Sequence, residues 1–356
     1  MGDVGIMGLR APGGSWDETK ELAIMADDLG YSCVTMGESW GEDAFTSLAQ
    51  IAAVTERIKI GTSIVPVFAR SPANLAMTAL NMDVMSKGRF FLGLGASGKL
   101  VIEDLHGEKF SKPITRIREY VDILRKAMNG ERLDHSGEFF EINRFRLRFT
   151  PHRPDLPIYI ASLSPPSLKM TGEIADGWLP IFLAPSRMEA AVSQLREGAE
   201  SVGRSLEDIT ISPQVSVYVT DDPKLARDRE RPHISFYIGG MGVFYHQYMH
   251  RIGFGEEADM VRKAYLDKER GKAASLVTDE MVDATTIIGT PEECAAQMKN
   301  FFDAGVDEIR LVLNEDTKEA YQATIQSLAP FINSVSYTHL RAHETDSYLV
   351  CRLLLE

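Results

Sequence analysis

Cysteine is scarce in this sequence, and its three cysteines are far apart. Cys33, Cys294 and Cys351 show no C-x-x-C spacing, which excludes a disulfide scaffold and a zinc ribbon. No stretch approaches about 18 uninterrupted apolar residues, and no basic segment leads into an apolar run at the N-terminus. The sequence therefore predicts neither a membrane span nor a secretory signal, and we expect a cytoplasmic protein.

Positive charge is also in short supply, because 38 Lys and Arg stand against 51 Asp and Glu, a formal net charge of -13 at pH 7. Proteins bind nucleic-acid backbones with concentrated Lys and Arg, so we expect no nucleic-acid partner. An anionic ligand would need a locally basic cleft. The hydrophobic share of 44% excludes a disordered chain, and 356 residues suffice for one large domain or two ordinary ones.

The C-terminal segment 335–356 differs from the rest of the chain. Its sequence, VSYTHLRAHETDSYLVCRLLLE, has no clean hydrophobic period and no capping signal. It resembles a translated sequencing-adapter read-through, with a native C-terminal helix as the alternative. We interpret it as a non-native tail, leave it out of the fold argument and expect a single domain over residues 1–334.

Short apolar runs alternate with amphipathic segments along that domain. Ser15 and Glu18 have the spacing of a capping box and predict a helix that ends at Gly30, and Thr290 and Glu293 predict another helix start. We expect eight strands, near residues 4, 33, 58, 90, 158, 177, 209 and 309. Eight strands alternating with helices predict an α/β fold of the (β/α)8 TIM-barrel type. An open doubly wound sheet is the alternative.

Two stretches do not fit the simple repeat. Residues 130–157 have the pattern of a β-hairpin, and residues 221–286 are too many for one helix. Long insertions on a barrel usually shape the substrate pocket, so we expect both to lie near the site.

Two short motifs are set aside. Gly93 to Gly98 satisfies G-x-G-x-x-G, but no helix begins directly after it and no acidic residue follows the next strand, so we interpret it as a glycine-rich loop at a strand end. His246 and His250 are four residues apart, but Gln247 replaces the glutamate of H-E-x-x-H and no third ligand is apparent. We therefore expect no metal site.

Longer stretches carry a family resemblance. They are GESWGEDAFTSLAQIAAVTERIKIGTSIVPVFARSPANLAMTA, GRFFLGLGASG, VIEDLHGEKFSKPITRIREYVDILRKAMNGE, IYIASLSPPSLKMTGEIADGWLP, FYIGGMG and ATTIIGTPEECAAQMKNFFDAGVDEIRLVL. Together they resemble the luciferase-like monooxygenase superfamily over residues 3–333, and most of all its branch that uses the deazaflavin coenzyme F420, with methylene-tetrahydromethanopterin reductase-like and F420-dependent glucose-6-phosphate dehydrogenase-like members. The resemblance implies a barrel that binds a flavin or deazaflavin at its C-terminal mouth and transfers a hydride to or from a small-molecule substrate.

The resemblance also implies which residues hold the coenzyme. The family places a non-prolyl cis peptide at the strand end Thr62-Ser63-Ile64, where the bond would be Ser63–Ile64, with an ordinary trans strand end as the alternative. The turn before a helix offers backbone N–H groups to the coenzyme phosphate, although Leu163 and Ser164 replace two glycines common in related enzymes. The complete implied set is Thr62, Ser63, Ile64, Gly95, Ala96, Ser97, Ala161, Ser162, Leu163, Ser164 and Gly177.

For catalysis the resemblance points to an acidic residue, here Glu38, and we add His106 as a second proton donor. The neighbouring histidine that serves as the acid in some relatives is Ser39 here, which keeps open a non-catalytic coenzyme-binding barrel. Five aromatic residues could wall a pocket for a planar ligand, with core packing as the alternative for each: Trp40, Trp178, Phe236, Tyr237 and Tyr245.

Two further expectations follow from the family. The oligoglutamate tail of coenzyme F420 is anionic, and a basic strip could hold it, with a solvated helix face as the alternative: Arg70, Lys99, Lys109, Lys112, Arg116 and Arg118. FMN shares the ring system and the ribityl phosphate but not this tail, so an FMN-dependent monooxygenase is the alternative enzyme. Family members commonly form homodimers, and Phe45, Leu48 and Ile51 could supply an apolar patch for a dimer.

Overall fold

The computed structural model describes residues 2–332, so the predicted tail over 335–356 lies outside the described residues. Parallel strands form one continuous row in the order β10-β9-β8-β5-β3-β2-β1-β13-β11-β12. The strands of the barrel wall are β1 (Asp3–Met7), β2 (Cys33–Met36), β3 (Lys59–Thr62), β5 (Phe90–Gly95), β8 (Ile158–Ile160), β9 (Gly177–Trp178), β10 (Thr210–Ile211), β11 (Gln214–Val219) and β13 (Glu308–Leu313).

The row closes on itself because β10 and β11 are one stretch of chain, divided only by Ser212 and Pro213. β10 pairs with β9, and β11 pairs with β13, which in turn pairs with β1. The Gln214 amide donates to the Pro180 carbonyl at 2.8 Å, and the Asp307 amide donates to the Ile211 carbonyl at 3.0 Å. The predicted (β/α)8 barrel is therefore confirmed, and the open doubly wound alternative is wrong.

Proline explains why the predicted strand near residue 209 is divided. Pro213 has no N–H to donate to a strand ladder, so the regular pairing stops there and resumes at Gln214. Two short strands were not predicted from the sequence: β4 (Val65–Pro66), which pairs with β5, and β12 (Thr286–Gly289), which pairs with β11 outside the barrel. β12 follows a helix with no glycine or proline between them, so the sequence gives no boundary signal.

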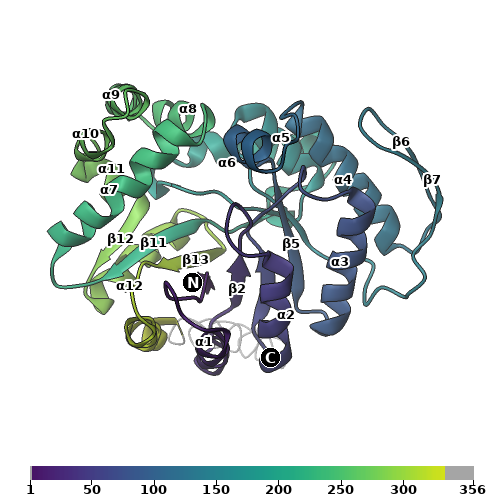
Figure 1. Cartoon of the computed structure of the whole chain (residues 1–356), viewed down its shortest axis with the longest axis horizontal. Helices are drawn as coiled ribbons and strands as arrows, with labels where there is room; N and C mark the ends of the chain where they lie inside the picture. The colour runs from purple at the N-terminus through teal and green to yellow at the C-terminus, as the bar shows by residue number, and fades with distance from the viewer. Residues whose placement is uncertain (1, 333–356) are drawn as a thin grey trace, which may run out of the picture.

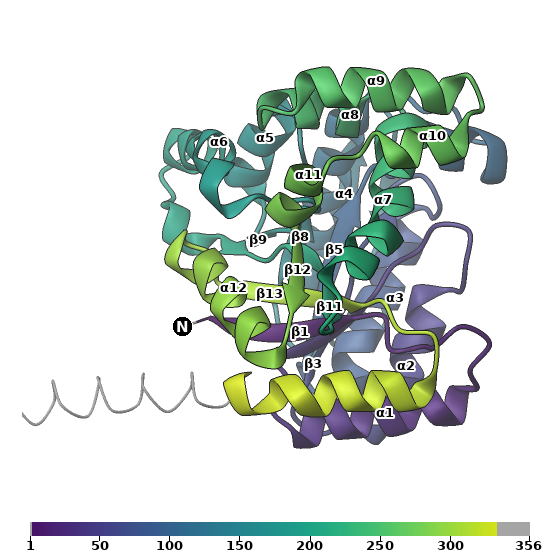
Figure 2. The ribbon, with the colours of Figure 1, turned by 90° about the vertical axis from the view of Figure 1, so that its left-hand side faces the viewer.

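The helices lie around the barrel, as Figures 1 and 2 show. Both predicted capping boxes are present, at Ser15 and at Thr290. The helices that alternate with the strands are α1 (Trp16–Asp28), α2 (Ala44–Val54), α3 (Pro72–Met85), α4 (Pro113–Met128), α5 (Pro165–Ile174), α6 (Glu189–Ser201) and α12 (Pro291–Asp303). A last helix over 318–332 runs along α1 in Figure 2, and the Tyr321 hydroxyl donates to the Arg10 carbonyl at 3.5 Å.

The apolar residues of α2 pack within this chain. Phe45 is 5% exposed, and Leu48 and Ile51 are fully buried, so they cannot form the dimer patch that the sequence suggested. The sequence could not separate a helix face that packs on a barrel from one that packs on a second subunit, because both are apolar.

Two glycines allow the backbones of α5 and α6 to come into direct contact where the helices cross. A Cβ atom at Gly172 would lie 2.1 Å from the Leu195 carbonyl oxygen, and a Cβ atom at Gly198 would lie 2.0 Å from the Lys169 carbonyl oxygen. Side chains larger than hydrogen at either position would push the two helices apart.

Both predicted insertions are present. The first is the antiparallel hairpin of β6 (Leu133–Ser136) and β7 (Glu141–Phe145). The second contains five helices, which lie together at the upper left of Figure 1: α7 (Pro223–Gly240), α8 (Phe244–Arg251), α9 (Gly255–Leu266), α10 (Arg270–Ser275) and α11 (Asp279–Thr285). Buried residues such as Ile238, Met249 and Val261 give these helices an apolar core of their own. Within residues 2–332, no helix has the length and apolar character needed to cross a membrane.

Candidate functional site

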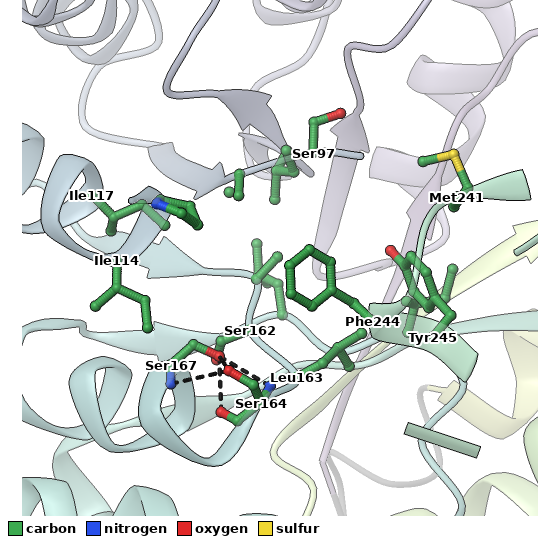
Figure 3. A pocket seen from close by; sticks show the side chains of 17 residues that line it. Ser97, Ile114, Ile117, Ser162, Leu163, Ser164, Ser167, Met241, Phe244 and Tyr245 are labelled. Carbon is green, nitrogen blue, oxygen red and sulfur yellow. Dashed lines mark hydrogen bonds between the residues drawn. The ribbon is translucent and has the colours of Figure 1, made fainter. Parts of the chain in front are cut away.

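A hollow of about 170 Å³ lies at the carboxyl ends of β5 and β8 (Figure 3). This end of a (β/α)8 barrel is where the active sites of such enzymes lie, because the loops after the strands meet there. Eight of the predicted coenzyme residues line it: Ile64, Gly95, Ala96, Ser97, Ala161, Ser162, Leu163 and Ser164. None of the described residues that line the hollow carries a charge.

Three predicted coenzyme residues do not line the hollow. The Thr62 hydroxyl donates to the Gly93 carbonyl and accepts from the Gly93 amide, both at 2.8 Å, so it joins β3 to β5. The Ser63 hydroxyl accepts from the Arg310 guanidinium. Gly177 packs so closely on Tyr159 that a Cβ atom would lie 2.6 Å from the tyrosine ring. These residues build the wall behind the hollow.

The predicted cis peptide bond between Ser63 and Ile64 is present. It stands directly after β3, and the second of its two residues, Ile64, lines the hollow. The adjacent wall, at the end of β5, is made by the backbone and small side chains of Gly95, Ala96 and Ser97. A flat group therefore meets little steric hindrance between the ends of β3 and β5.

The turn before α5 has a polar surface that faces the hollow (Figure 3). Ser164 is the N-cap of α5, and its hydroxyl accepts from the Ser167 amide at 3.4 Å and lies 2.9 Å from the Ser167 hydroxyl. Pro165 and Pro166 occupy the first two helical positions and have no N–H to offer. The first two helical positions therefore offer no N–H to an anion, and the side-chain donors at this helix N-terminus are the two serine hydroxyls.

The opposite wall of the hollow is apolar, and most of it was not predicted. Figure 3 shows Ile114 and Ile117 of α4 across the hollow from Phe244 of α8, and the full set of unpredicted apolar residues is Pro113, Ile114, Ile117, Leu179, Ile181, Met241 and Phe244. The isoleucines of α4 gave a helix signal. In the insertion the sequence pointed to Phe236, Tyr237 and Tyr245 as wall residues, but it did not single out Met241 or Phe244.

The predicted aromatic residues take different places. Tyr245 lines the hollow, and burial raises the pKa of its hydroxyl. The ring of Tyr237 packs edge-on against that of Tyr245, with 4.7 Å between the ring centroids, and Phe236 packs edge-on against the exposed Trp40 at 5.7 Å. None of these three residues lines the hollow. Trp178 is fully buried, and its indole N–H donates to the Ser162 carbonyl at 2.9 Å. Trp178 is therefore a core residue, which is the alternative that the sequence left open for it.

Glu38, the first predicted proton donor, is held in an ion pair beside the hollow. Its Oε1 accepts from Nη2 of Arg70 at 2.8 Å and from the Ala44 amide at 3.2 Å. Arg70 also pairs with Asp43, and its hydrogen bond to Glu38 raises the pKa of the guanidinium. Both oxygens of Glu38 thus contact one arginine in a two-point carboxylate–guanidinium pair. Glu38 does not line the hollow.

The second predicted proton donor, His106, is exposed at the end of the π-helix η1 (Val101–Leu105) and does not line the hollow.

The predicted basic strip is largely paired with acidic side chains. Lys99 lies 3.6 Å from Glu103, and Lys112 and Arg118 pair with Glu138 and Glu173. Arg116 stacks on the rings of Phe68, Phe139 and Phe140, whereas Lys109 is exposed.

The fold and the hollow define a (β/α)8 barrel with an uncharged, largely apolar ligand site at the C-terminal mouth and a polar helix N-terminus at its edge. The sequence profile of the luciferase-like monooxygenase family matches residues 4–308. The chain belongs to this family, and the resemblance seen in the sequence is confirmed.

Within this family, three proteins similar to this chain are reductases or oxidoreductases by name. A Mycobacterium tuberculosis protein, provisionally named a coenzyme F420-dependent oxidoreductase, is 36% identical over 304 residues, which cover 80% of this chain and 88% of that protein. The 5,10-methylenetetrahydromethanopterin reductase of Archaeoglobus fulgidus is 27% identical over 88% of this chain and 95% of the relative. The structure of the coenzyme F420-dependent tetrahydromethanopterin reductase of Methanopyrus kandleri superposes with a TM-score of 0.80 at 24% identity, over 93% of this chain and 99% of that one.

Proposed function

We propose that the chain is a coenzyme F420-dependent oxidoreductase, which transfers a hydride between the deazaflavin ring and a small organic substrate. The observation that carries the proposal is the pairing of two features in one hollow: an uncharged apolar lining at the ends of β3 and β5, and a serine-capped helix N-terminus at its edge, so that this apolar part is the slot for a ring. The slot suits a planar ring, and the helix terminus suits a phosphate. The name of the Mycobacterium tuberculosis relative supports the choice of coenzyme F420.

The residues of the hollow fit such a coenzyme. Ile64 and Ala96 would contact the ring on the β3 and β5 side, Ile117 would contact it from α4, and Phe244 would contact it from α8 across the hollow. Ser164 and Ser167 would bind the phosphate with their hydroxyls. The coenzyme, when bound, supplies the hydride chemistry, and the protein contributes position and exclusion of water. A hollow of about 170 Å³ holds the ring portion, and the long tail would lie along the open mouth.

In this proposal Glu38 is a positioning residue and not the proton donor that the sequence suggested. Its carboxylate pairs with Arg70, and taking up the proton that it would have to donate would break that ion pair. The Glu38–Arg70 pair fixes the chain between β2 and α3 beside the hollow, since Arg70 also binds Asp43 at the start of α2. The proton that accompanies hydride transfer would then come from water or from the substrate.

One observation favours FMN as the alternative coenzyme. Three of the cations that were predicted to bind the oligoglutamate tail, Lys99, Lys112 and Arg118, already have acidic partners. Such pairs lower the attraction for an anionic tail, and FMN has no such tail. FMN-dependent monooxygenation is therefore the second candidate function.

Titration of the purified chain with each coenzyme tests the proposal. We expect coenzyme F420 to bind with micromolar affinity and FMN to bind more weakly, as followed by quenching of coenzyme fluorescence. Reduction of bound coenzyme F420 by a panel of alcohols would separate an enzyme from a binding protein. Micromolar FMN binding without detectable F420 binding would contradict the proposal. An F420 affinity that does not change with salt would contradict the basic strip alone.

We also propose a homodimer, on the family resemblance alone, because the α2 patch first suggested for it is buried. Light scattering at micromolar concentration should give twice the mass of 39.5 kDa. A single-chain mass over the same concentration range would contradict the homodimer and leave the coenzyme proposal untouched.

A further inference from the structure

Three potential metal ligands converge on the surface where α8 meets α9. His246 and His250 project from one face of α8, and Nε2 of each ring lies within hydrogen-bond distance of the same Oδ1 of Asp259 on α9, at 2.7 Å and 2.9 Å. One ligand atom from each of the three side chains lies within 4.8 Å of the other two. The sequence showed only the two histidines, because the third ligand comes from the next helix, 13 residues after His246.

We propose that His246, His250 and Asp259 form a binding site for a divalent transition metal of the zinc class. Two histidines four residues apart on a helix present their Nε2 atoms to one point, a spacing that zinc sites use. Imidazole nitrogen with one carboxylate oxygen is a donor set that suits Zn²⁺, Co²⁺, Ni²⁺ and Cu²⁺ and does not suit Mg²⁺ or Ca²⁺, which prefer oxygen ligands.

The hydrogen bonds show how a metal would enter. A carboxylate only accepts, so in the structure each Nε2 carries a proton that it donates to Asp259. On metal binding a neutral ring moves its proton through solvent from Nε2 to Nδ1, and a doubly protonated ring releases its Nε2 proton to solvent. In both cases the freed Nε2 lone pair binds the metal. No oxidant or reductant takes part in this step.

The metal site would be open to solvent, because two of its three ligand side chains are exposed. Asp259 is 60% exposed and His250 is 44% exposed at the side chain, so solvent reaches the ligand atoms directly. Water would complete the coordination, and the metal would exchange readily with solution. Zinc sites with three protein ligands keep an open position in the same way.

The site would also brace the wall of the hollow. Phe244 and Tyr245, which line the hollow, directly precede His246 on α8. A metal bound between α8 and α9 would join this helix to its neighbour by coordination bonds in place of two hydrogen bonds. This consequence concerns the insertion itself and does not depend on which coenzyme the hollow binds.

Calorimetric titration of the full chain with ZnCl₂ tests the site. A second histidine pair with the same spacing, His339 and His343, occurs in the sequence, so the titration uses a chain that carries His339→Ala and His343→Ala. We expect one zinc ion per chain, and a rise in melting temperature with zinc, because a ligand that binds the folded state stabilises it. Co²⁺ should give the visible absorption of a nitrogen-ligated ion.

Three variants in the same background decide the assignment. His250→Ala and Asp259→Asn should each weaken zinc binding about tenfold or more, because each removes a ligand. Gln247→Ala, an exposed residue on the same turn of α8, should bind zinc as the parent does. Circular dichroism checks that each variant is folded. Zinc binding that is absent from the parent, or unchanged in both His250→Ala and Asp259→Asn, would overturn the proposal.

Discussion

Ser164→Asp should lower the affinity for the coenzyme about 100-fold, which is about 2.7 kcal/mol of binding free energy. Ser164 is the N-cap of α5 at the edge of the hollow, where the phosphate would bind. Aspartate is as good an N-cap as serine and suits the positive end of the helix dipole, so α5 should keep its start. Its carboxylate would, however, stand where the phosphate must lie, and the two like charges repel each other.

Ser164→Asn is the matched control for this prediction. Asparagine has the shape and the capping ability of aspartate but no charge, so its variant should bind the coenzyme within a few-fold of the parent. Fluorescence titration measures both variants, and thermal unfolding checks their stability. Because FMN and coenzyme F420 share the phosphate, the test locates the phosphate whichever coenzyme binds. Unchanged affinity in Ser164→Asp would show that the phosphate lies elsewhere.

Arg310→Met should lower the free energy of unfolding by about 3–5 kcal/mol. Arg310 is fully buried on β13, and its guanidinium crosses the barrel interior to the Ser63 hydroxyl after β3, a strand that is not a neighbour of β13. It also donates to Ser212, to the hydroxyl at 3.0 Å and to the carbonyl at 2.6 Å. Methionine would leave these acceptors without a donor and remove the cation near the buried carboxylate of Glu308.

Urea unfolding followed by circular dichroism at pH 7 measures the effect. Arg310→Lys keeps a positive charge but loses the planar fork, so it should recover only part of the loss. Since Arg310 holds the Ser63 hydroxyl and the next residue, Ile64, lines the hollow, the methionine variant should also bind the coenzyme less tightly. Full stability in Arg310→Met would show that apolar packing can replace this polar network in the barrel interior.

The sequence predicted best those features whose cause is local. Capping boxes such as Ser15 with Glu18, the hairpin in the first insertion and the eight strand regions all depend on residues a few positions apart, and the structure contains them. The turn around Ser164 was predicted from the family resemblance, but the effect of its two prolines on the available N–H donors emerged only with the helix in place.

Features that depend on distant parts of the chain were missed or misplaced. The charge of Arg70 was assigned to a coenzyme tail, but folding brings it to Glu38, 32 residues away. Phe244 reaches the hollow only because the insertion folds back over the barrel mouth. The third ligand of the histidine cluster, Asp259, lies on another helix. Hydrophobic periodicity shows which side chains of a helix or strand are buried, but it does not show which distant residue each of them contacts.

The glycine contact between α5 and α6 can change the position of the Ser164 turn at the edge of the hollow, where we propose that a phosphate binds. Gly172 lies eight residues after Ser164, which is about 12 Å along the axis of α5 at 1.5 Å per residue. Because packed interiors transmit displacement, a methyl group at Gly172 or Gly198 would shift α5 and carry the serine turn with it. The fit of a phosphorylated ligand can therefore be tuned, by evolution or by design, at two positions that no ligand touches.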